Sequence, residues 1–145
     1  MVFPRRLATA LSLAVLLAAC SAAEDGSSGG ELRTIEIRTS DELRYDPENI
    51  SVEAGETVRF VVINEGETAH EFLIGDETAQ AEFAAEMAAG GAHRHTNAGV
   101  TVEPGQTETF EYRFDEAGAD LLAGCHEPGH YDGGMVASIT VTDPA

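Results

Sequence analysis

The chain of 145 residues contains no lysine, and all eight of its basic residues are arginines. Two of these lie in the N-terminal leader, so six arginines stand against 26 acidic residues in the remainder, a formal net charge of about −20. Such a surface repels phosphate backbones and anionic lipid headgroups. The composition therefore excludes nucleic-acid binding and favours a cationic partner, while plain solubility is the simpler use of the same charge.

Cysteine is scarce, with only Cys20 and Cys125 in the whole chain. If Cys20 belongs to an export leader, Cys125 is the single thiol of the folded part and cannot form an internal disulfide. A free thiol is a liability in an oxidising compartment, so a thiolate occupied by a metal ion explains Cys125. The alternative is a small residue buried in the core.

The leader has no apolar run long enough to span a bilayer comfortably, because its apolar stretch covers only residues 7–19. Two arginines followed by such a stretch predict an export signal over residues 1–20. The ending Leu17-Ala18-Ala19-Cys20 resembles a bacterial lipobox, in which the cysteine becomes the lipid-modified first residue. We expect a lipid anchor at Cys20 on the periplasmic or extracellular face of a membrane; otherwise Cys20 is lost with an ordinary signal peptide.

Residues 21–31 are rich in glycine and serine and contain no apolar residue larger than alanine. This composition predicts a flexible tether with a reach on the order of 20 Å. Residues 32–145 are long enough for one domain and contain no visible internal repeat.

Short strand-like segments dominate this domain. Thr57 to Asn64 is strongly apolar, and Thr107 to Phe114 alternates cleanly, with Phe110, Tyr112 and Phe114 on one face. The other expected strands cover residues 32–39, 50–53, 72–74, 121–124 and 136–141, and residues 100–106 are expected to form a strand followed by a turn. A further turn is expected at residues 45–49. Seven or eight strands joined by short turns predict an all-β fold, a Greek-key β-sandwich or barrel.

One segment breaks the strand pattern. Glu77 to Ala89 is rich in alanine and glutamate, with Phe83 and Met87 four positions apart. It predicts a helix of about three turns, capped by Asp76 or Thr78.

The most specific pattern is Cys125-His126-Glu127-Pro128-Gly129-His130-Tyr131-Asp132-Gly133-Gly134-Met135. A thiolate, an imidazole five positions later and a thioether five positions further are soft donors that suit copper better than a hard cation. Expected strands flank the run, and Pro-Gly and Gly-Gly pairs supply turns, so it reads as a metal-binding loop. His70, between two apolar stretches far upstream, is the natural supplier of one more nitrogen.

The set His70, Cys125, His130 and Met135 resembles the ligands of the cupredoxins, the family of plastocyanin and azurin, over residues 32 to 142. The resemblance implies one type 1 (blue) copper, with Met135 as a long axial ligand, in a protein that transfers single electrons and is not an enzyme. We expect a monomer with an unidentified redox partner, and the acidic composition favours a basic docking surface on that partner. Many members have asparagine where this chain has Glu71, and the sequence does not say whether this carboxylate accepts the equivalent backbone N–H bonds.

His126, directly after the expected ligand Cys125, has two possible roles. Neighbours on a strand point to opposite faces, so His126 should face away from a metal held by Cys125. It is expected either to form an exposed edge through which electrons pass or to be a polar surface residue.

Residues 76–97 form an insertion that carries Met87, His93 and His95. It resembles the Met- and His-bearing insertion of periplasmic cupredoxins associated with copper tolerance, which implies a second copper site and a role in tolerance or delivery. The alternative is that Met87 packs the helix onto the barrel and the histidines are solvated. A copper oxidase or nitrite reductase is disfavoured, because a single domain has no second substrate-binding metal set.

Overall fold

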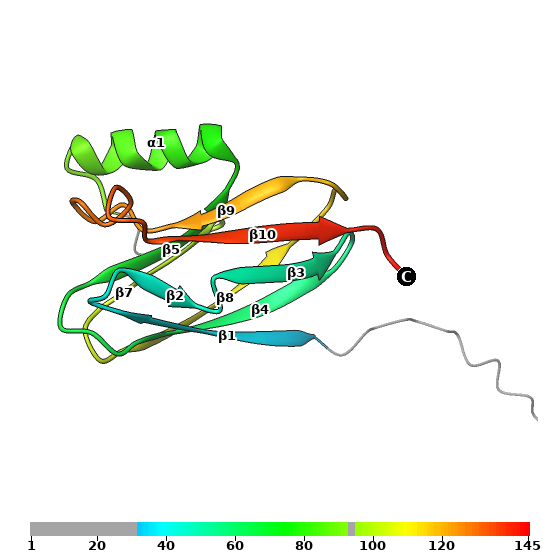
Figure 1. Cartoon of the computed structure of the whole chain (residues 1–145), viewed down its shortest axis with the longest axis horizontal. Helices are drawn as coiled ribbons and strands as arrows, with labels where there is room; N and C mark the ends of the chain where they lie inside the picture. Colours follow the sequence, from blue (N-terminus) through cyan, green and yellow to red (C-terminus); the bar gives the residue numbers. More distant parts are fainter. Residues whose placement is uncertain (1–31, 93–94) are drawn as a thin grey trace, which may run out of the picture.

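A computed structural model describes residues 32–92 and 95–145, so the predicted leader (1–20) and tether (21–31) lie outside the described residues. In the described part the chain forms ten strands and one α-helix (Figure 1). The elements are β1 Arg33–Ser40, β2 Arg44–Asp46, β3 Asn49–Glu53, β4 Thr57–Asn64, β5 His70–Gly75, α1 Glu77–Ala88, β6 His95–Thr96, β7 Gly99–Val102, β8 Thr107–Arg113, β9 Asp120–Gly124 and β10 Val136–Thr142.

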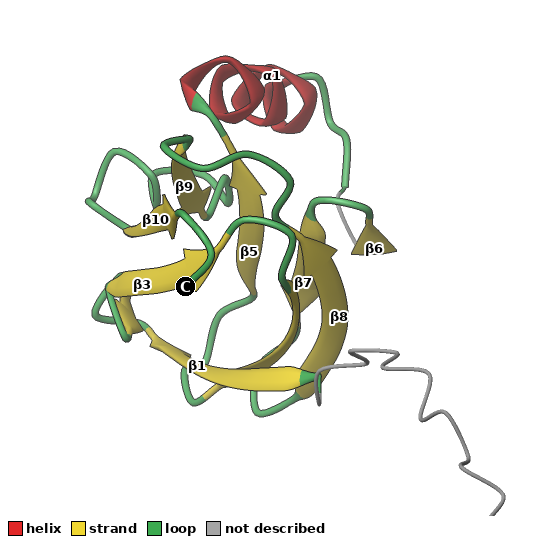
Figure 2. Cartoon of the chain, turned by 90° about the vertical axis from the view of Figure 1, so that its right-hand side faces the viewer, coloured by secondary structure: helices red, strands yellow, loops and turns green. Residues whose placement is uncertain are grey.

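The strands form two sheets that face each other (Figure 2). One has four strands in the order β2-β1-β4-β8, and the other has six in the order β3-β10-β9-β5-β7-β6. Strands β1 and β4 pair in parallel, as do β3 and β10, and the remaining pairs are antiparallel. The expected all-β sandwich with a short helical insertion is confirmed.

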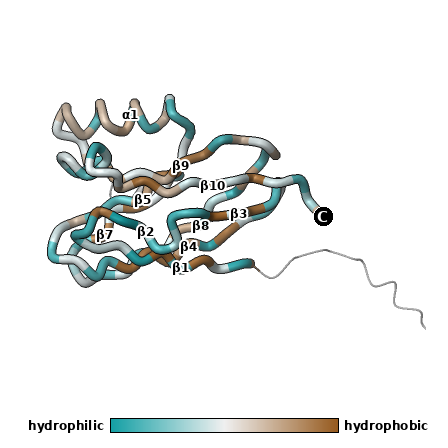
Figure 3. The backbone as a smooth tube through the Cα atoms, viewed as in Figure 1, coloured by the Kyte–Doolittle hydropathy of each residue, from teal (hydrophilic) through white to brown (hydrophobic). Residues whose placement is uncertain are grey.

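Period-two alternation builds the core between the sheets. Along β4, Val58, Phe60 and Val62 point inward and are buried, alternating with less buried residues, and Figure 3 shows hydrophobic colour along much of this strand. The ring of Phe60 stacks 5.3 Å from that of Phe110 on the neighbouring strand β8, and it lies 5.5 Å from the ring of Phe72 in β5, so this second aromatic contact joins the two sheets. Burial of this surface is the main force that holds the sandwich together.

Two short strands were not predicted. Strand β2 occupies Arg44–Asp46, where a turn was expected, and β6 pairs with the end of β7. The turn prediction was wrong at Tyr45 because its burial outweighs the local turn signal: the ring packs edge-on against Phe72 at 5.2 Å, and its hydroxyl donates to the backbone carbonyl of Glu71. Pairing of Thr39 with Tyr45 then makes β2 an edge strand.

Helix α1 agrees with its prediction to within one residue. Asp76 is the N-cap, and its carboxylate accepts the Ala79 N–H over 2.8 Å. The helix lies outside the six-stranded sheet, against β5 and β9, on the side away from β1 (Figure 2). It is the only helix in residues 32–92 and 95–145, and it is neither long nor apolar enough to cross a bilayer.

Candidate metal centre

The expected ligands come from strand ends at one pole of the sandwich. His70 is the first residue of β5, Cys125 follows β9, and Met135 precedes β10. His130 lies in the β9–β10 loop, drawn in orange beneath α1 in Figure 1. Antiparallel pairing of β5 with β9 places Leu73 opposite Gly124, so the upstream and downstream ligand segments are neighbours in the sheet.

Three donor atoms converge at this pole. His130 Nδ1 lies 3.3 Å from Cys125 Sγ and 3.3 Å from His70 Nδ1, and the three donors all fall within 4.8 Å of one another. Cys125 and His70 are fully buried, and His130 is half-buried. Two imidazole nitrogens and one sulfur make a compact, soft donor set, which fits copper.

Met135 is fully buried and belongs to the same loop. Its N–H donates to the carbonyl of His130 over 3.0 Å, and its own carbonyl accepts the N–H of Cys125 over 3.3 Å. These bonds fold the loop back on itself and fix the backbone of Met135 beside that of two other expected ligands.

The thiol of Cys125 is held in an apolar setting. Burial raises its pKa to about 12, more than the N–H groups of Glu71 and Glu127 lower it. The Glu71 N–H donates to Sγ over 3.3 Å. At neutral pH the metal-free protein therefore holds a protonated thiol, and a bound metal ion replaces that proton.

His70 is held in its neutral form. Burial, and then the neighbouring ring of His130, lower the pKa of His70. A neutral imidazole keeps a lone pair for a metal. Its Nδ1 points into the donor cluster, whereas Nε2 lies 3.4 Å from Asp41 Oδ1 on the opposite side of the ring.

Glu71 links the two ligand segments. Its buried carboxylate accepts the backbone N–H of His126 through Oε2 over 2.9 Å, and Oε1 lies 3.4 Å from the hydroxyl of Thr101. The carboxylate thus takes up the backbone bond that the sequence left in question. It ties β5 to the residue directly after Cys125.

Both sequence-based roles for His126 are wrong, because the residue is only 6% exposed. Its Nε2 lies 2.8 Å from Gln80 Oε1, and its ring stacks on Tyr131 with centroids 4.8 Å apart. Gln80 Nε2 in turn donates to the carbonyls of Leu73 and Leu122, over 2.9 and 3.1 Å. His126 does face away from Cys125, but it faces the covering helix rather than solvent.

The predicted second site is described only at Met87, which is half-buried and lines a hollow of about 330 Å³ between α1 and the β9–β10 loop. His93 lies outside the described residues, and His95 is described only through its backbone in β6. The second site therefore stays a prediction.

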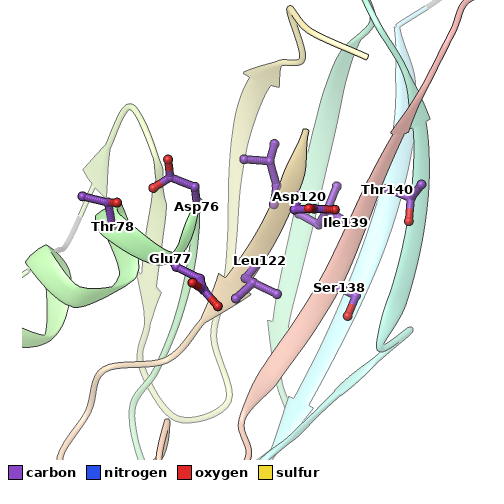
Figure 4. A pocket seen from close by; sticks show the side chains of 9 residues that line it. Asp76, Glu77, Thr78, Asp120, Leu122, Ser138, Ile139 and Thr140 are labelled. Atoms are coloured by element: carbon purple, nitrogen blue, oxygen red, sulfur yellow. The ribbon is translucent and has the colours of Figure 1, made fainter. Parts of the chain in front are cut away.

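A separate hollow of about 560 Å³ lies beside the N-terminus of α1 (Figure 4). Asp76 and Glu77 line it on the helix side, and Asp120, Leu122 and Ser138 line it on the sheet side. None of the four expected ligands lines this hollow, so it is not part of the metal centre.

Sequence reasoning missed two residues that support the centre, Asp41 and Gln80. Gln80 precedes Phe83 and Met87 at the spacing of one helix face, and this spacing marks it as inward-facing. Asp41 stands in an exposed polar turn with no periodic signal. Only the tertiary structure brings it to His70.

Residues 33–142 match the model of the copper binding proteins of the plastocyanin/azurin family. The chain belongs to this family. It is a cupredoxin, and copper is the metal that its donor cluster fits.

This cupredoxin is similar to the copper-resistant cuproprotein CopI of Rubrivivax gelatinosus, with 38% identity over 80% of this chain and 70% of the relative. It is 33% identical to CopI of Pseudomonas aeruginosa over 96% of this chain and 98% of the relative. Among solved structures, auracyanin of Roseiflexus castenholzii superposes with a TM-score of 0.66 at 26% identity, covering 78% of this chain and 99% of auracyanin.

Proposed function

We propose that this cupredoxin is a type 1 copper protein that carries single electrons, with His70, Cys125 and His130 as equatorial ligands and Met135 as the axial ligand. The observation that carries the proposal is the convergence of two imidazole nitrogens and one buried sulfur within 4.8 Å. Bound copper would supply a one-electron couple between its cupric and cuprous forms.

The protein contributes a fixed donor set. His70 starts a buried strand, and the loop that carries the other three ligands closes through its own backbone bonds. Ligands held in this way move little between oxidation states, which favours fast electron transfer. Buried Phe72 and Ala123, in the two ligand-bearing strands, help to exclude water and so raise the reduction potential.

The proposal includes a cellular setting. The protein is exported and anchored through Cys20 at the periplasmic or extracellular face of a membrane, as the leader motif indicates. It acts as a monomer, is not an enzyme, and exchanges electrons with an unidentified partner whose docking surface is basic. The excess of acidic residues over six arginines supports such a partner.

Copper tolerance or delivery is the second candidate, because two of the relatives are named as copper-resistant cuproproteins. In this alternative the insertion holds a second copper through Met87, His93 and His95, and electron transfer is incidental. The two candidates share the first copper and differ in the second.

Copper titration of the metal-free protein tests both candidates. We expect an intense visible thiolate-to-copper charge-transfer band that saturates at one equivalent and is lost in Cys125→Ser. A colourless protein after loading with cupric salt contradicts the type 1 centre. A second equivalent that binds tightly, and disappears in a His93→Ala/His95→Ala double variant, favours tolerance.

A further inference from the structure

Asp41 lies outside the expected ligand set but next to it. It follows β1, at the same pole of the sandwich as the ligand loops. Its Oδ1 lies 3.4 Å from Nε2 of His70. That nitrogen is buried and makes no full hydrogen bond within the described part of the chain, so the Asp41 carboxylate is the acceptor placed to satisfy it.

The two nitrogens of His70 have different surroundings. Nδ1 faces the donor cluster, where it lies 3.3 Å from His130 Nδ1. An imidazole that gives its Nδ1 lone pair to a metal carries its proton on Nε2. In the copper-loaded protein, the Nε2 proton of His70 therefore points toward Asp41.

The carboxylate of Asp41 is fixed independently of His70. Its Oδ2 accepts the Glu67 N–H over 2.7 Å, and its Oδ1 accepts the hydroxyl and N–H of Thr68 over 2.7 and 3.2 Å. The Glu67 N–H and then the Thr68 hydroxyl lower the pKa of Asp41 to about 2, so the group is charged at neutral pH. A Cβ on Gly66 would lie 2.5 Å from Oδ1, which explains why this turn needs glycine.

Residues 41–45 also contact the other ligand segments. Leu43, whose φ of 58° is in the left-handed region, lies against Gly133 of the ligand loop. A side chain at position 133 would clash, because its Cβ would lie only 2.5 Å from Leu43 Cδ1. Arg44 donates to the carbonyl of Gly134 over 3.1 Å, and the Tyr45 hydroxyl donates to the carbonyl of Glu71. One short segment thus touches both the upstream and the downstream ligand segments, and this holds Asp41 in place.

We infer that Asp41 is a positioning residue of the copper centre, whose carboxylate orients the His70 ring through Nε2 and increases the electron density that His70 offers to the metal. A carboxylate behind a ligating histidine fixes the ring and raises its basicity, which favours the cupric over the cuprous ion. The inference rests on the copper centre that both candidate functions share. It does not depend on which function is correct.

The test compares Asp41→Asn with Glu42→Gln in the copper-loaded protein. Asparagine keeps one of the two oxygens that accept from Glu67 and Thr68, and it removes the charge behind His70. Glu42→Gln removes one charge from the adjacent exposed residue. Chelator competition gives the affinities for cupric and cuprous ions, and voltammetry gives the reduction potential.

We expect Asp41→Asn to weaken cupric binding by about 10- to 100-fold and cuprous binding less. The reduction potential should then rise, by about 59 mV for each tenfold change in the ratio of the two affinities. The charge-transfer band should shift in Asp41→Asn and stay unchanged in Glu42→Gln, whose charge is screened by solvent.

Equal shifts in the two variants would overturn the inference, because they would reflect net charge alone. So would an unchanged affinity ratio and band in both Asp41→Asn and Asp41→Ala, even if the melting temperature fell, because the role would then be purely structural. These results would leave the copper centre intact. Failure of the unsubstituted protein to develop the band would overturn the inference and the type 1 centre together.

Discussion

At the scale of single residues, the centre combines a buried thiol, Cys125, with the neutral imidazole of His70. Burial raises the pKa of Cys125 to about 12 and lowers the pKa of His70. Both groups are therefore uncharged in the metal-free protein at neutral pH. Copper has to displace a proton from sulfur but none from His70.

The protonated thiol of Cys125 predicts how copper binding depends on pH. Below the thiol pKa, each cupric ion bound releases one proton, so the apparent affinity should rise about tenfold per pH unit between pH 7 and 9. Competition titrations with a chelator of known pH dependence measure the slope. Cys125→Ser should lose the slope together with the charge-transfer band, and a flat profile in the unsubstituted protein would contradict a protonated thiol.

Glu71 gives a prediction about stability. Glu71→Ala removes the acceptor for the buried N–H of His126, and an unsatisfied buried donor costs about 1–3 kcal/mol. Glu71→Gln keeps an amide oxygen at that place and should lose less. Urea unfolding of the metal-free variants measures both free energies; equal losses would show that the charge, rather than the hydrogen bond, matters.

The ligands could be predicted from sequence because four soft donors at compatible spacing in a β-patterned chain are themselves a signal. The residues around them could not. Asp41 meets His70, and Gln80 meets His126, only after segments 29 and 46 positions apart are packed together. The burial of His126 follows from the placement of α1, and nothing in its neighbouring residues indicates it.

At the scale of elements, α1 is attached to the sheet largely through one buried amide. Gln80 is the only fully buried residue of the described helix, and its side chain contacts three strand carbonyls, those of Leu73, Gly75 and Leu122, as well as His126. The helix therefore depends on polar pairing as well as on the half-buried Phe83 and Met87.

Gln80→Ala should lower the free energy of unfolding by about 1–3 kcal/mol, since it removes the buried hydrogen bonds that its amide makes with strand carbonyls and with His126. Gln106→Ala, at an exposed turn, is the matched control and should stay within about 0.5 kcal/mol. Chemical denaturation followed by circular dichroism compares them. A loss no larger than that of the control would show that packing alone holds the helix.

The elements that sequence predicted well carry local signals. Strand β4 is strongly apolar, β8 alternates in polarity, and α1 has an N-cap aspartate. Strand β2 has no such signal, because Tyr45 becomes a strand residue only through its contacts with Phe72 and Glu71. The pairing partner of β2, strand β1, is adjacent in sequence, but the contacts that bury Tyr45 come from a distant part of the chain and cannot be read from residues 44–46.

At the scale of the whole molecule, excess negative charge is the dominant surface property. The five arginines in the described part, Arg33, Arg38, Arg44, Arg59 and Arg113, all pair with carboxylates. Acidic residues far outnumber them, and the self-repulsion of these residues opposes the compact state.

We expect the melting temperature of the metal-free protein to rise between 0.01 and 0.15 M salt, as the screening length falls from about 30 to 8 Å. Calorimetry in sodium chloride and in choline chloride measures the effect. Equal shifts in the two salts indicate general screening. A rise confined to sodium would indicate specific cation binding and contradict the repulsion argument.

Strand β1 runs from one pole of the sandwich to the pole that carries the expected ligands. It starts at Arg33 and delivers the chain to Asp41 beside the ligands, about 25 Å away at the usual rise per residue. Strand β10 runs back from the ligand loop, so the C-terminus emerges at the distant pole as well (Figure 1). Any attachment made through either chain end would leave the tip that carries the expected copper ligands pointing away from the point of attachment.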